Sequence, residues 1–405
     1  MALDILFLGR LFPREREQEI KSKMKTGLQD AANALQWNII DGFEENNAGT
    51  MRIVNYLPVD AYPKGYTDSF IEGFRFSHTD KYNDGDVNVK CCNIFGIKRF
   101  INIFYFKKHI KKWAREKSDK QKVLFSYTAN SMFLTLARLA KSINPDIKVA
   151  CLIADIPEYS TVSVLTGFKK LYHDYEVKKT AALYGVVDKY VLLTAHMAER
   201  LGLKSPFMVM EGIATTDTAV AADESNDYGR YVLYTGLLNK RFGLCNLVDA
   251  FSMLEDKDVK LILCGSGDAE DYIAQKQKED SRIITLGRVD RARALSLQKN
   301  AAVLVNPRQN NEDFTKFSFP SKNLEYLSSG VPMVGYKLDG IPDEYDDYII
   351  YPADDSPEAL SNKLAGLLAL SDGERKAMGE KARHFVCESK NKVAQAKRII
   401  EFLND

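Results

Sequence analysis

The sequence has few of the residues that build metal centres, disulfide frameworks or redox pairs. Its 405 residues include 5 His, 6 Cys and 2 Trp, and no two Cys have C-x-x-C spacing. Cys151 and Cys264 lie within apolar runs that are typical of buried strands, so we expect free thiols, the usual state of cysteine in the cytoplasm. No cluster of His and Cys has the spacing of metal ligands, so we expect no metal site.

Long apolar runs and an excess of either charge are also missing. No apolar run approaches the roughly 20 residues of a membrane span. The run at residues 5–8 is too short for a signal-peptide core and follows Asp4, so we expect a cytoplasmic protein. The formal net charge is +1, which gives no overall field that would attract nucleic acid or a membrane.

The chain instead alternates short apolar runs with amphipathic helical patterns, which is typical of parallel α/β sheets. Its length suits two such domains, and the small, polar, acidic segment 214–230 is interpreted as a linker. In the first half we expect strands at residues 3–8, 38–40, 51–57, 123–127, 148–154, 189–193 and 207–210, and helices at 15–35, 131–142 and 164–183. In the second half we expect strands at 231–234, 259–264, 283–286, 303–306, 334–338 and 348–351, and final helices at 357–370, 372–387 and 390–403.

The segment FSFPSKNLEYLSSGVPMV at residues 317–334 carries the strongest functional pattern. Pro320 favours a helix start, Ser321 is expected to cap the helix, and Gly330 ends it. The N–H groups at a helix start attract anions, and Lys322 in the first turn needs an anion nearby. Glu325 follows on roughly the same face, where its carboxylate can accept hydrogen bonds from sugar hydroxyls. The segment predicts a sugar-nucleotide site, with a capped and solvated α/β helix as the alternative.

The pattern P-S-K-x-x-E-Y-L-x-x-G-x-P at residues 320–332 resembles the nucleotide-binding segment of family 4 glycosyltransferases, which have the GT-B fold. The resemblance implies an α/β protein with two Rossmann-like doubly wound domains facing a central cleft. Residues 1–213 would bind the acceptor, 214–230 form the linker, 231–388 bind the sugar nucleotide, and 389–405 pack back on the first domain as a crossover helix. Glu325 matches the second Glu of the family's E-x7-E motif, which holds the ribose, whereas Phe317 replaces the first Glu, which usually contacts the donor sugar.

The resemblance also implies the other residues of the donor site. The turn at residues 235–243 is similar to the family's G-x-L-x-x-x-x-G loop, in which an Arg and a Lys bind the donor diphosphate. Leu237 replaces that Arg, so Lys240 or Arg241 would supply the charge, unless both are solvated loop cations; we prefer Arg241 for its bidentate geometry. The expected donor-binding residues are Gly9, Gly236, Lys240, Arg241, Arg288, Val289, Ser321, Lys322, Asn323 and Glu325, with 288–289 beside the nucleobase.

Two loops of the first domain are candidates for the acceptor side. Gly9 and Arg10 follow the first expected strand, and the resemblance implies that this loop faces the cleft; a plain connector is the alternative. Asp155 and Glu158 follow the strand at 148–154. Asp155 is expected to orient the acceptor hydroxyl or accept its proton, unless it only caps the loop. The expected catalytic residues are Arg241, Lys322 and Asp155.

The stretch at residues 98–117 is rich in Lys, Arg and aromatic side chains. A basic amphipathic helix with aromatics is typical of a helix that lies on an anionic membrane surface. The alternative is a core helix whose solvated face is basic. No nucleic-acid motif accompanies the stretch, so nucleic acid is not an expected partner. We therefore expect a cytoplasmic protein, with peripheral attachment to the inner face of the membrane if the first interpretation holds.

The expected reaction transfers a hexose-type sugar from a UDP- or GDP-linked donor to a hydroxyl of a glycan or polyprenyl-linked acceptor, with retention at the anomeric carbon as the family implies. No cofactor or metal is expected, because cationic side chains can stabilise the departing diphosphate. A sugar-nucleotide 2-epimerase of similar fold and a catalytically degenerate GT-B partner subunit remain alternatives. An oxidoreductase is not favoured, because GSG at residues 265–267 lacks the third Gly of the dinucleotide fingerprint.

Overall fold

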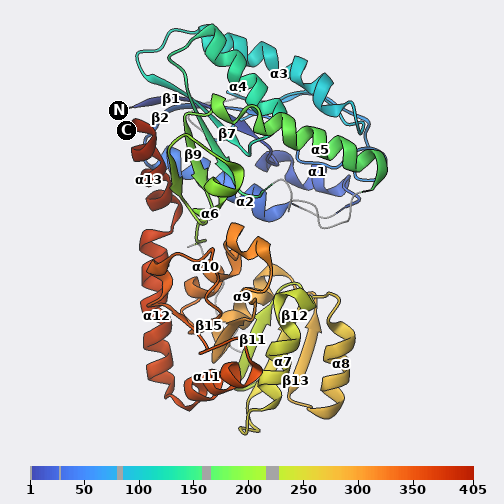
Figure 1. Ribbon diagram of the computed structural model, residues 1–405, viewed down its shortest axis with the longest axis vertical. Coiled ribbons are helices and arrows are strands. Elements are labelled where there is room, and N and C mark those ends of the chain that lie inside the picture. Colours follow the sequence, from blue (N-terminus) through green and yellow to red (C-terminus); the bar gives the residue numbers. More distant parts are fainter. Residues whose placement is uncertain (1, 27–28, 80–84, 157–165, 216–227) are drawn as a thin grey trace. The chain divides into compact units, whose positions relative to one another are not determined.

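The computed structural model describes residues 2–26, 29–79, 85–156, 166–215 and 228–405, which form two compact units (Figure 1). Unit 1 comprises Met1–Glu211 and Lys392–Asp405, and unit 2 comprises Gly212–Asn391. Each unit contains its own largely parallel sheet with helices packed around it. The predicted α/β class is therefore confirmed.

Unit 1 contains an eight-stranded sheet with the order β10-β9-β8-β7-β1-β2-β5-β4, in which only β4 and β5 pair antiparallel. Its strands are β1 (Leu3–Gly9), β2 (Gly49–Asn55), β4 (Phe74–Phe76), β5 (Asp86–Asn88), β7 (Gln121–Tyr127), β8 (Lys148–Ile153), β9 (Lys189–Leu192) and β10 (Phe207–Val209). β3 (Phe70–Ile71) and β6 (Cys91–Cys92) form a separate pair. The strand order reverses at β1, between β2 and β7, and doubly wound sheets bind ligands at the carboxyl ends of strands at such a point.

The helices of unit 1 are α1 (Glu17–Ser22), α2 (Asp30–Glu45), α3 (Lys98–Arg115), α4 (Ser131–Ile143), α5 (Gly167–Ala181), α6 (His196–Leu201) and α13 (Lys392–Asn404). α3 packs against α4, α4 contacts α5, and the C-terminal α13 packs against α2. Gly42 of α2 permits this close approach, because a Cβ there would lie 2.4 Å from the Lys392 carbonyl oxygen and 2.6 Å from the Cβ of Ala396.

One strand predicted in this unit is a helix. Residues 38–40 lie inside α2, in which Gln36, Trp37, Ile40 and Phe43 are buried with helical spacing. The two adjacent isoleucines suggested a short strand, but tertiary packing of the helical face outweighs their β propensity. The helix predicted at residues 15–35 is also divided, since α1 ends at Ser22 and α2 begins at Asp30.

Unit 2 contains a six-stranded, wholly parallel sheet with the order β13-β12-β11-β14-β15-β16. Its strands are β11 (Tyr231–Thr235), β12 (Lys260–Cys264), β13 (Ile283–Gly287), β14 (Val303–Asn306), β15 (Met333–Gly335) and β16 (Ile349–Ile350). Its helices are α7 (Leu244–Ser252), α8 (Glu270–Glu279), α9 (Arg291–Asn300), α10 (Ser321–Ser328), α11 (Pro357–Ala369) and α12 (Asp372–Ser389). Each strand overlaps the segment that the sequence predicted.

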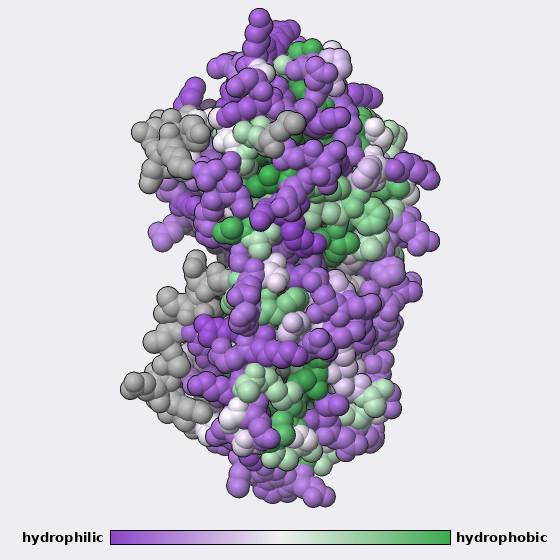
Figure 2. All heavy atoms as spheres, turned by 90° about the vertical axis from the view of Figure 1, so that its left-hand side faces the viewer, coloured by the Kyte–Doolittle hydropathy of each residue, from purple (hydrophilic) through white to green (hydrophobic). Residues whose placement is uncertain are grey.

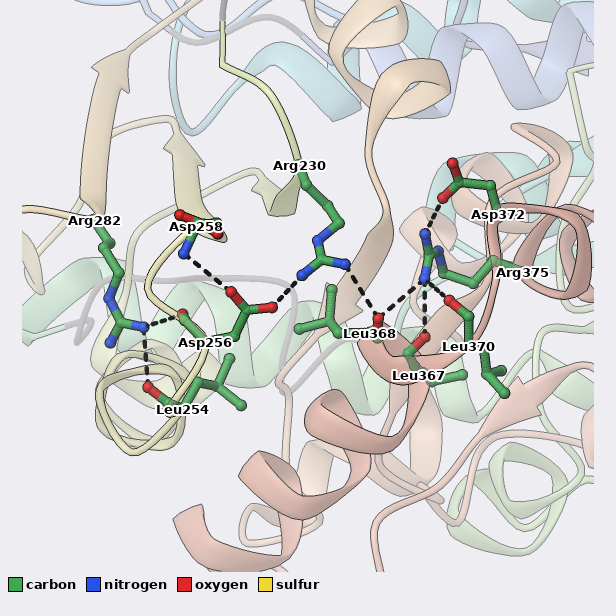
Figure 3. Close-up of polar contacts among 10 residues, drawn as sticks. All are labelled: Arg230, Leu254, Asp256, Asp258, Arg282, Leu367, Leu368, Leu370, Asp372 and Arg375. Atoms are coloured by element: carbon green, nitrogen blue, oxygen red, sulfur yellow. Dashed lines mark hydrogen bonds and ion pairs between the residues drawn. The ribbon is translucent and has the colours of Figure 1, made fainter.

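In unit 2, one buried arginine binds carbonyl groups at the end of α11 and another binds the segment that follows α7 (Figure 3). Arg375, which is 6% exposed, donates from Nη1 to the carbonyl oxygens of Leu367, Leu368 and Leu370 at the end of α11, and its Nη2 pairs with Asp372. Arg282 donates to the carbonyl oxygens of Leu254 and Asp256, beyond the end of α7, at 3.0 and 2.6 Å. Arg375 thus supplies donors to carbonyl groups at the negative end of α11, and Arg282 ties down the segment that follows α7.

The face of the protein drawn in Figure 2 is mostly hydrophilic, with smaller groups of hydrophobic side chains between the polar ones. Among the helices of the described residues, none is both long and apolar enough to cross a bilayer.

Candidate functional site

The start of α10 differs from the prediction in one respect. Pro320 is the N-cap, no side chain caps the helix, and Ser321 is its first helical residue. The predicted capping role of Ser321 is therefore wrong, because proline already fixes the backbone at the position before the helix. Asn323 is buried, and its Oδ1 accepts a hydrogen bond of 2.7 Å from Asn306 at the end of β14. Asn323 thus anchors α10 to the sheet.

Lys322 extends from α10 across the turn that follows β11. A Cβ at Gly236, whose φ is +154°, would lie 2.4 Å from Cε and 3.1 Å from Nζ of Lys322. Burial lowers the pKa of Lys322, the negative charge of Glu325 opposes this shift, and the positive charge of Arg291 adds to it. The structure thus brings together Gly236, Lys322 and Glu325, three of the predicted donor-binding residues.

Glu325 is held by Gln298, which has no distinctive feature in the sequence. Gln298 of α9 is fully buried and donates from Nε2 to Glu325 Oε1 at 2.6 Å and to Thr235 Oγ1 at 3.0 Å. The other carboxylate oxygen, Oε2, lies 3.7 Å from Arg291 Nη1, and the Glu325 side chain is 30% exposed. Glu325 therefore has a fixed orientation and an accessible edge that can accept hydrogen bonds from a ligand.

A pair of arginines lies at the neighbouring strand ends. Arg241 is in the short helix Lys240–Phe242, and its guanidinium carbon is 4.5 Å from the ring centre of Phe314. Arg308, two residues beyond β14, lies 4.4 Å from the same ring, and burial with the nearby charge of Arg241 lowers its pKa to about 10. Lys240 is exposed; its backbone N–H donates to Asp268 Oδ1 at 2.7 Å, and its carbonyl oxygen accepts from the Gly243 N–H. Sequence reasoning missed Arg308, for which the only signal was its place in a polar loop.

A pocket of about 300 Å³ lies beside these residues, at the ends of β12 and β13. Its volume is at the lower end of the range for small-molecule sites. Arg288 lines it and donates from Nε to Ser266 Oγ at 2.8 Å, whereas Val289 packs against the core of unit 2. The pocket is lined by Leu238, Gly265, Ser266, Glu270, Ala274, Gln277, Thr285, Gly287 and Arg288.

The candidates of unit 1 lie at the carboxyl ends of its strands. Gly9 ends β1 against Asn55, whose Oδ1 would be 3.2 Å from a Cβ at Gly9. Asp155 follows β8. The residue as a whole is exposed, but neighbouring protein atoms desolvate its carboxyl group and raise the pKa of that group. Its charge also acts on Tyr127 at the end of β7. Glu158 lies outside the described residues.

The stretch predicted as an interfacial helix forms α3, but two of its cations point into the protein. Lys98 donates to the Val59 carbonyl oxygen, and Arg99 pairs with Glu176 of α5. Several aromatic and aliphatic side chains instead face outward, with Phe104 67% and Leu171 of α5 70% exposed. We call the exposed group Phe95, Phe100, Phe104, Leu171 and Tyr175 the α3–α5 patch. Lys179 joins its two helices, with Nζ 5.2 Å from the Phe100 ring and 5.6 Å from the Tyr175 ring.

Comparison with known proteins agrees with this arrangement. Residues 229–370 match the family model described as Glycosyl transferases group 1. No curated protein sequence matches the chain.

Similar solved structures include Anabaena HepE in complex with UDP, with 12% identity over 100% of both chains and a TM-score of 0.63. A sucrose-phosphate synthase from Thermosynechococcus elongatus has 13% identity over 100% of this chain and 98% of its own, with a TM-score of 0.62. The lipopolysaccharide outer core galactosyltransferase WaaB has 14% identity over 99% and 100%, with a TM-score of 0.61. The chain therefore has the GT-B fold, as predicted, and its second unit carries the segment that matches the group 1 glycosyl transferases.

Proposed function

We propose that the protein is a retaining, metal-independent glycosyltransferase. It moves a hexose-type sugar from a nucleoside diphosphate sugar to a hydroxyl group of a lipid-linked or polysaccharide acceptor. The observation that carries this proposal is the group formed at the strand ends of unit 2, where Lys322 lies against Gly236 and Gln298 fixes Glu325. The match of residues 229–370 to the glycosyl transferase model supports it.

In this proposal each part of the donor meets chemically suited residues. Lys322 and the start of α10 bind the diphosphate, because a helix N-terminus and an ammonium both favour anions. Leu237 stands where the family has a diphosphate-binding Arg, so Arg241 and Arg308 supply the missing positive charge. Both guanidinium groups stack on the Phe314 ring, which orients them. Glu325 accepts hydrogen bonds from the ribose, and the nucleobase enters the pocket beside Arg288.

The transfer breaks the bond between the anomeric carbon and the diphosphate oxygen and forms one to the acceptor oxygen. Negative charge grows on the departing diphosphate, and the cations of unit 2 stabilise it. As the new bond forms, the acceptor hydroxyl passes its proton to a carboxylate, and we assign this role to Asp155 in unit 1. Desolvation raises the pKa of this carboxyl, which makes its carboxylate a stronger base.

We also propose that the α3–α5 patch attaches the protein to the anionic surface on which a lipid-linked acceptor is found. Exposed aromatic and aliphatic side chains can enter the lipid interface, while Lys108, Lys111 and Lys112 of α3 are exposed beside them. Each such lysine contributes about 1 kcal/mol near an anionic membrane. This charge complementarity favours lipid over a protein partner.

The reaction is tested by incubating the protein with a panel of UDP- and GDP-hexoses, first alone and then with polyprenyl-linked or oligosaccharide acceptors. We expect nucleotide protection against thermal unfolding, acceptor-dependent release of the nucleoside diphosphate that EDTA does not reduce, and retained anomeric configuration by NMR. Conversion of the donor sugar without any acceptor would indicate an epimerase. Absence of nucleotide binding would indicate a degenerate subunit, and either result contradicts the proposal.

Membrane attachment is tested by sedimentation with phosphatidylglycerol-containing vesicles at low salt. Replacing Lys107, Lys108, Lys111 and Lys112 by Ala should release the protein from the pellet. The matched control replaces four exposed lysines elsewhere, namely Lys204, Lys257, Lys278 and Lys376. Equal sedimentation of both variants, or binding that does not weaken with salt, contradicts the assignment.

A further inference from the structure

The carboxyl edge of the unit 1 sheet holds two cations that have no role in the donor site described above. Arg10 directly follows β1, and its guanidinium carbon lies 5.2 Å from the ring centre of Tyr56. Lys98, the first residue of α3, has its ammonium 5.9 Å from the same ring centre. Tyr56 directly follows β2, the neighbour of β1. Three chain segments therefore bring both cations to adjacent strand ends.

Neither cation has a carboxylate partner within the described part of the chain. Lys98 donates to the Val59 carbonyl oxygen and to Asn93 Oδ1, both at 2.7 Å, and both acceptors are neutral. Nε of Arg10 is buried and has no hydrogen-bond partner among the described residues.

The nearby charged groups do not neutralise this pair. Asp60 acts on Lys98 only at longer range, and its Oδ2 accepts a hydrogen bond from Thr26. Arg99 is already paired with Glu176. Asp155 follows β8, on the opposite side of β7 from Arg10, and the charges of both residues act on Tyr127 at the end of β7.

Two partly buried like charges are unfavourable unless an anion joins them. Burial lowers the pKa of Lys98 to about 8, and the charge of Arg10 contributes to that shift. A bound anion would raise the pKa of Lys98 again and reduce the repulsion between Lys98 and Arg10. A guanidinium binds phosphate or carboxylate through two parallel hydrogen bonds, and an ammonium adds a point charge beside it.

A further unpaired donor lies at the next strand end. β7 pairs with β1 on its other side, with Leu8 opposite Ser126, so Arg10 lies beside the residues that follow β7. There Thr128 has a φ of 72°, a strained conformation that is concentrated at binding sites. Asn130 caps α4 with Oδ1, while its Nδ2 is buried without a partner among the described residues. This edge therefore presents donors and positive charge together.

We propose that Arg10, Lys98 and Asn130 form an anion-binding subsite of unit 1, which takes a phosphate or carboxylate group carried by the acceptor. The proposal rests on sugar transfer as the function, for which unit 2 supplies its own cations to the donor diphosphate. It narrows the acceptor to a phosphorylated or acidic glycan, including one linked to lipid through phosphate, and excludes a neutral sugar.

The test uses the full chain saturated with UDP, so that the donor site is filled, and titrates inorganic phosphate, glucuronate and glucose by calorimetry. We expect binding of an anion and none of glucose. Arg10→Gln and Lys98→Met should each weaken anion binding at least about tenfold while leaving UDP affinity within about twofold. Lys98→Arg should keep anion binding, and Arg14→Gln, which alters an exposed cation of the same loop, should change neither affinity.

Stronger binding of phosphate identifies a phosphorylated acceptor, and stronger binding of glucuronate identifies an acidic sugar. Equal anion binding by wild type, Arg10→Gln and Lys98→Met would overturn the proposal, as would loss of UDP binding with unchanged phosphate binding. If wild type does not bind UDP, the proposed function fails, whereas phosphate titration of the same variants without UDP still tests the subsite. Should Lys98→Met not fold, Arg10→Gln and Lys98→Arg decide the question.

Discussion

Replacing Gly236 by Ala tests whether the nucleotide site depends on Lys322 lying against the turn after β11. The new Cβ would be 2.4 Å from Lys322 Cε and 2.9 Å from the Tyr234 hydroxyl, at a φ of +154°. Strained backbone of this kind costs about 1–3 kcal/mol, and overpacking adds a similar amount. Because the lysine end is flexible, we expect Lys322 to move away and relieve part of the crowding.

The displaced ammonium can no longer contribute its charge-assisted hydrogen bonds, which are worth about 1.5–3 kcal/mol. We therefore expect UDP affinity to fall roughly 10- to 100-fold by calorimetry, with a stability loss of about 2–4 kcal/mol in urea unfolding. Gly229→Ala is the matched control, since its φ is +69° but nothing lies within 4 Å of the new Cβ. If Gly236→Ala binds UDP as tightly as Gly229→Ala, the position of Lys322 is irrelevant to nucleotide binding and the reasoning is refuted.

Three further predictions follow from buried polar groups. Gln298→Met removes the donor that fixes Glu325 and should lower UDP affinity about tenfold in calorimetry; unchanged affinity would mean that the carboxylate needs no such support. Arg375→Met removes the guanidinium that donates to three carbonyl oxygens, of which Leu367 and Leu368 keep a second donor, and should lower the free energy of unfolding by about 1–3 kcal/mol in urea. Arg383→Met on the same helix should change it by less than about 0.5 kcal/mol. The pKa of Lys98 is lowered from 10.5 to about 8 in the folded protein, so the unfolded chain binds more protons between these two pH values. The free energy of unfolding should therefore rise from pH 8 to pH 10.5 by up to about 3 kcal/mol more in the wild type than in Lys98→Met. Parallel pH profiles of the two proteins would contradict this.

The central strands of unit 2, β11, β12, β14 and β15, were predictable because they are short apolar runs buried on both faces. The edge strand β13 is only partly buried, and its apolar residues 283, 284 and 286 sufficed to predict it. The stop at Gly330 was predictable for a similarly local reason, since its φ of 79° suits a residue without a side chain. Residues 38–40 were not, because only the packing of α2 against α13 decides that these isoleucines continue a helix.

The site residues that were not predicted depend on contacts with residues from distant segments of the chain. Gln298 and Arg308 have no distinctive sequence context. Their roles follow from Glu325 of α10 and Arg241 of the turn after β11, which lie in other segments of the chain. The inward orientation of Lys98 likewise depends on the carbonyl of Val59, far away in the chain. Periodicity showed that α3 is basic and amphipathic, but which of its lysines face solvent was set by tertiary contacts.

The central claim is that Lys322 and Glu325 hold the diphosphate and ribose of a sugar nucleotide. Its most direct test is calorimetric titration of UDP into the wild type, Lys322→Met and Glu325→Gln, with Lys316→Met, an exposed cation of the preceding loop, as control. We expect the wild type and the control to bind UDP alike and each site variant to lose about tenfold or more in UDP affinity. Wild-type affinity in both site variants would contradict it.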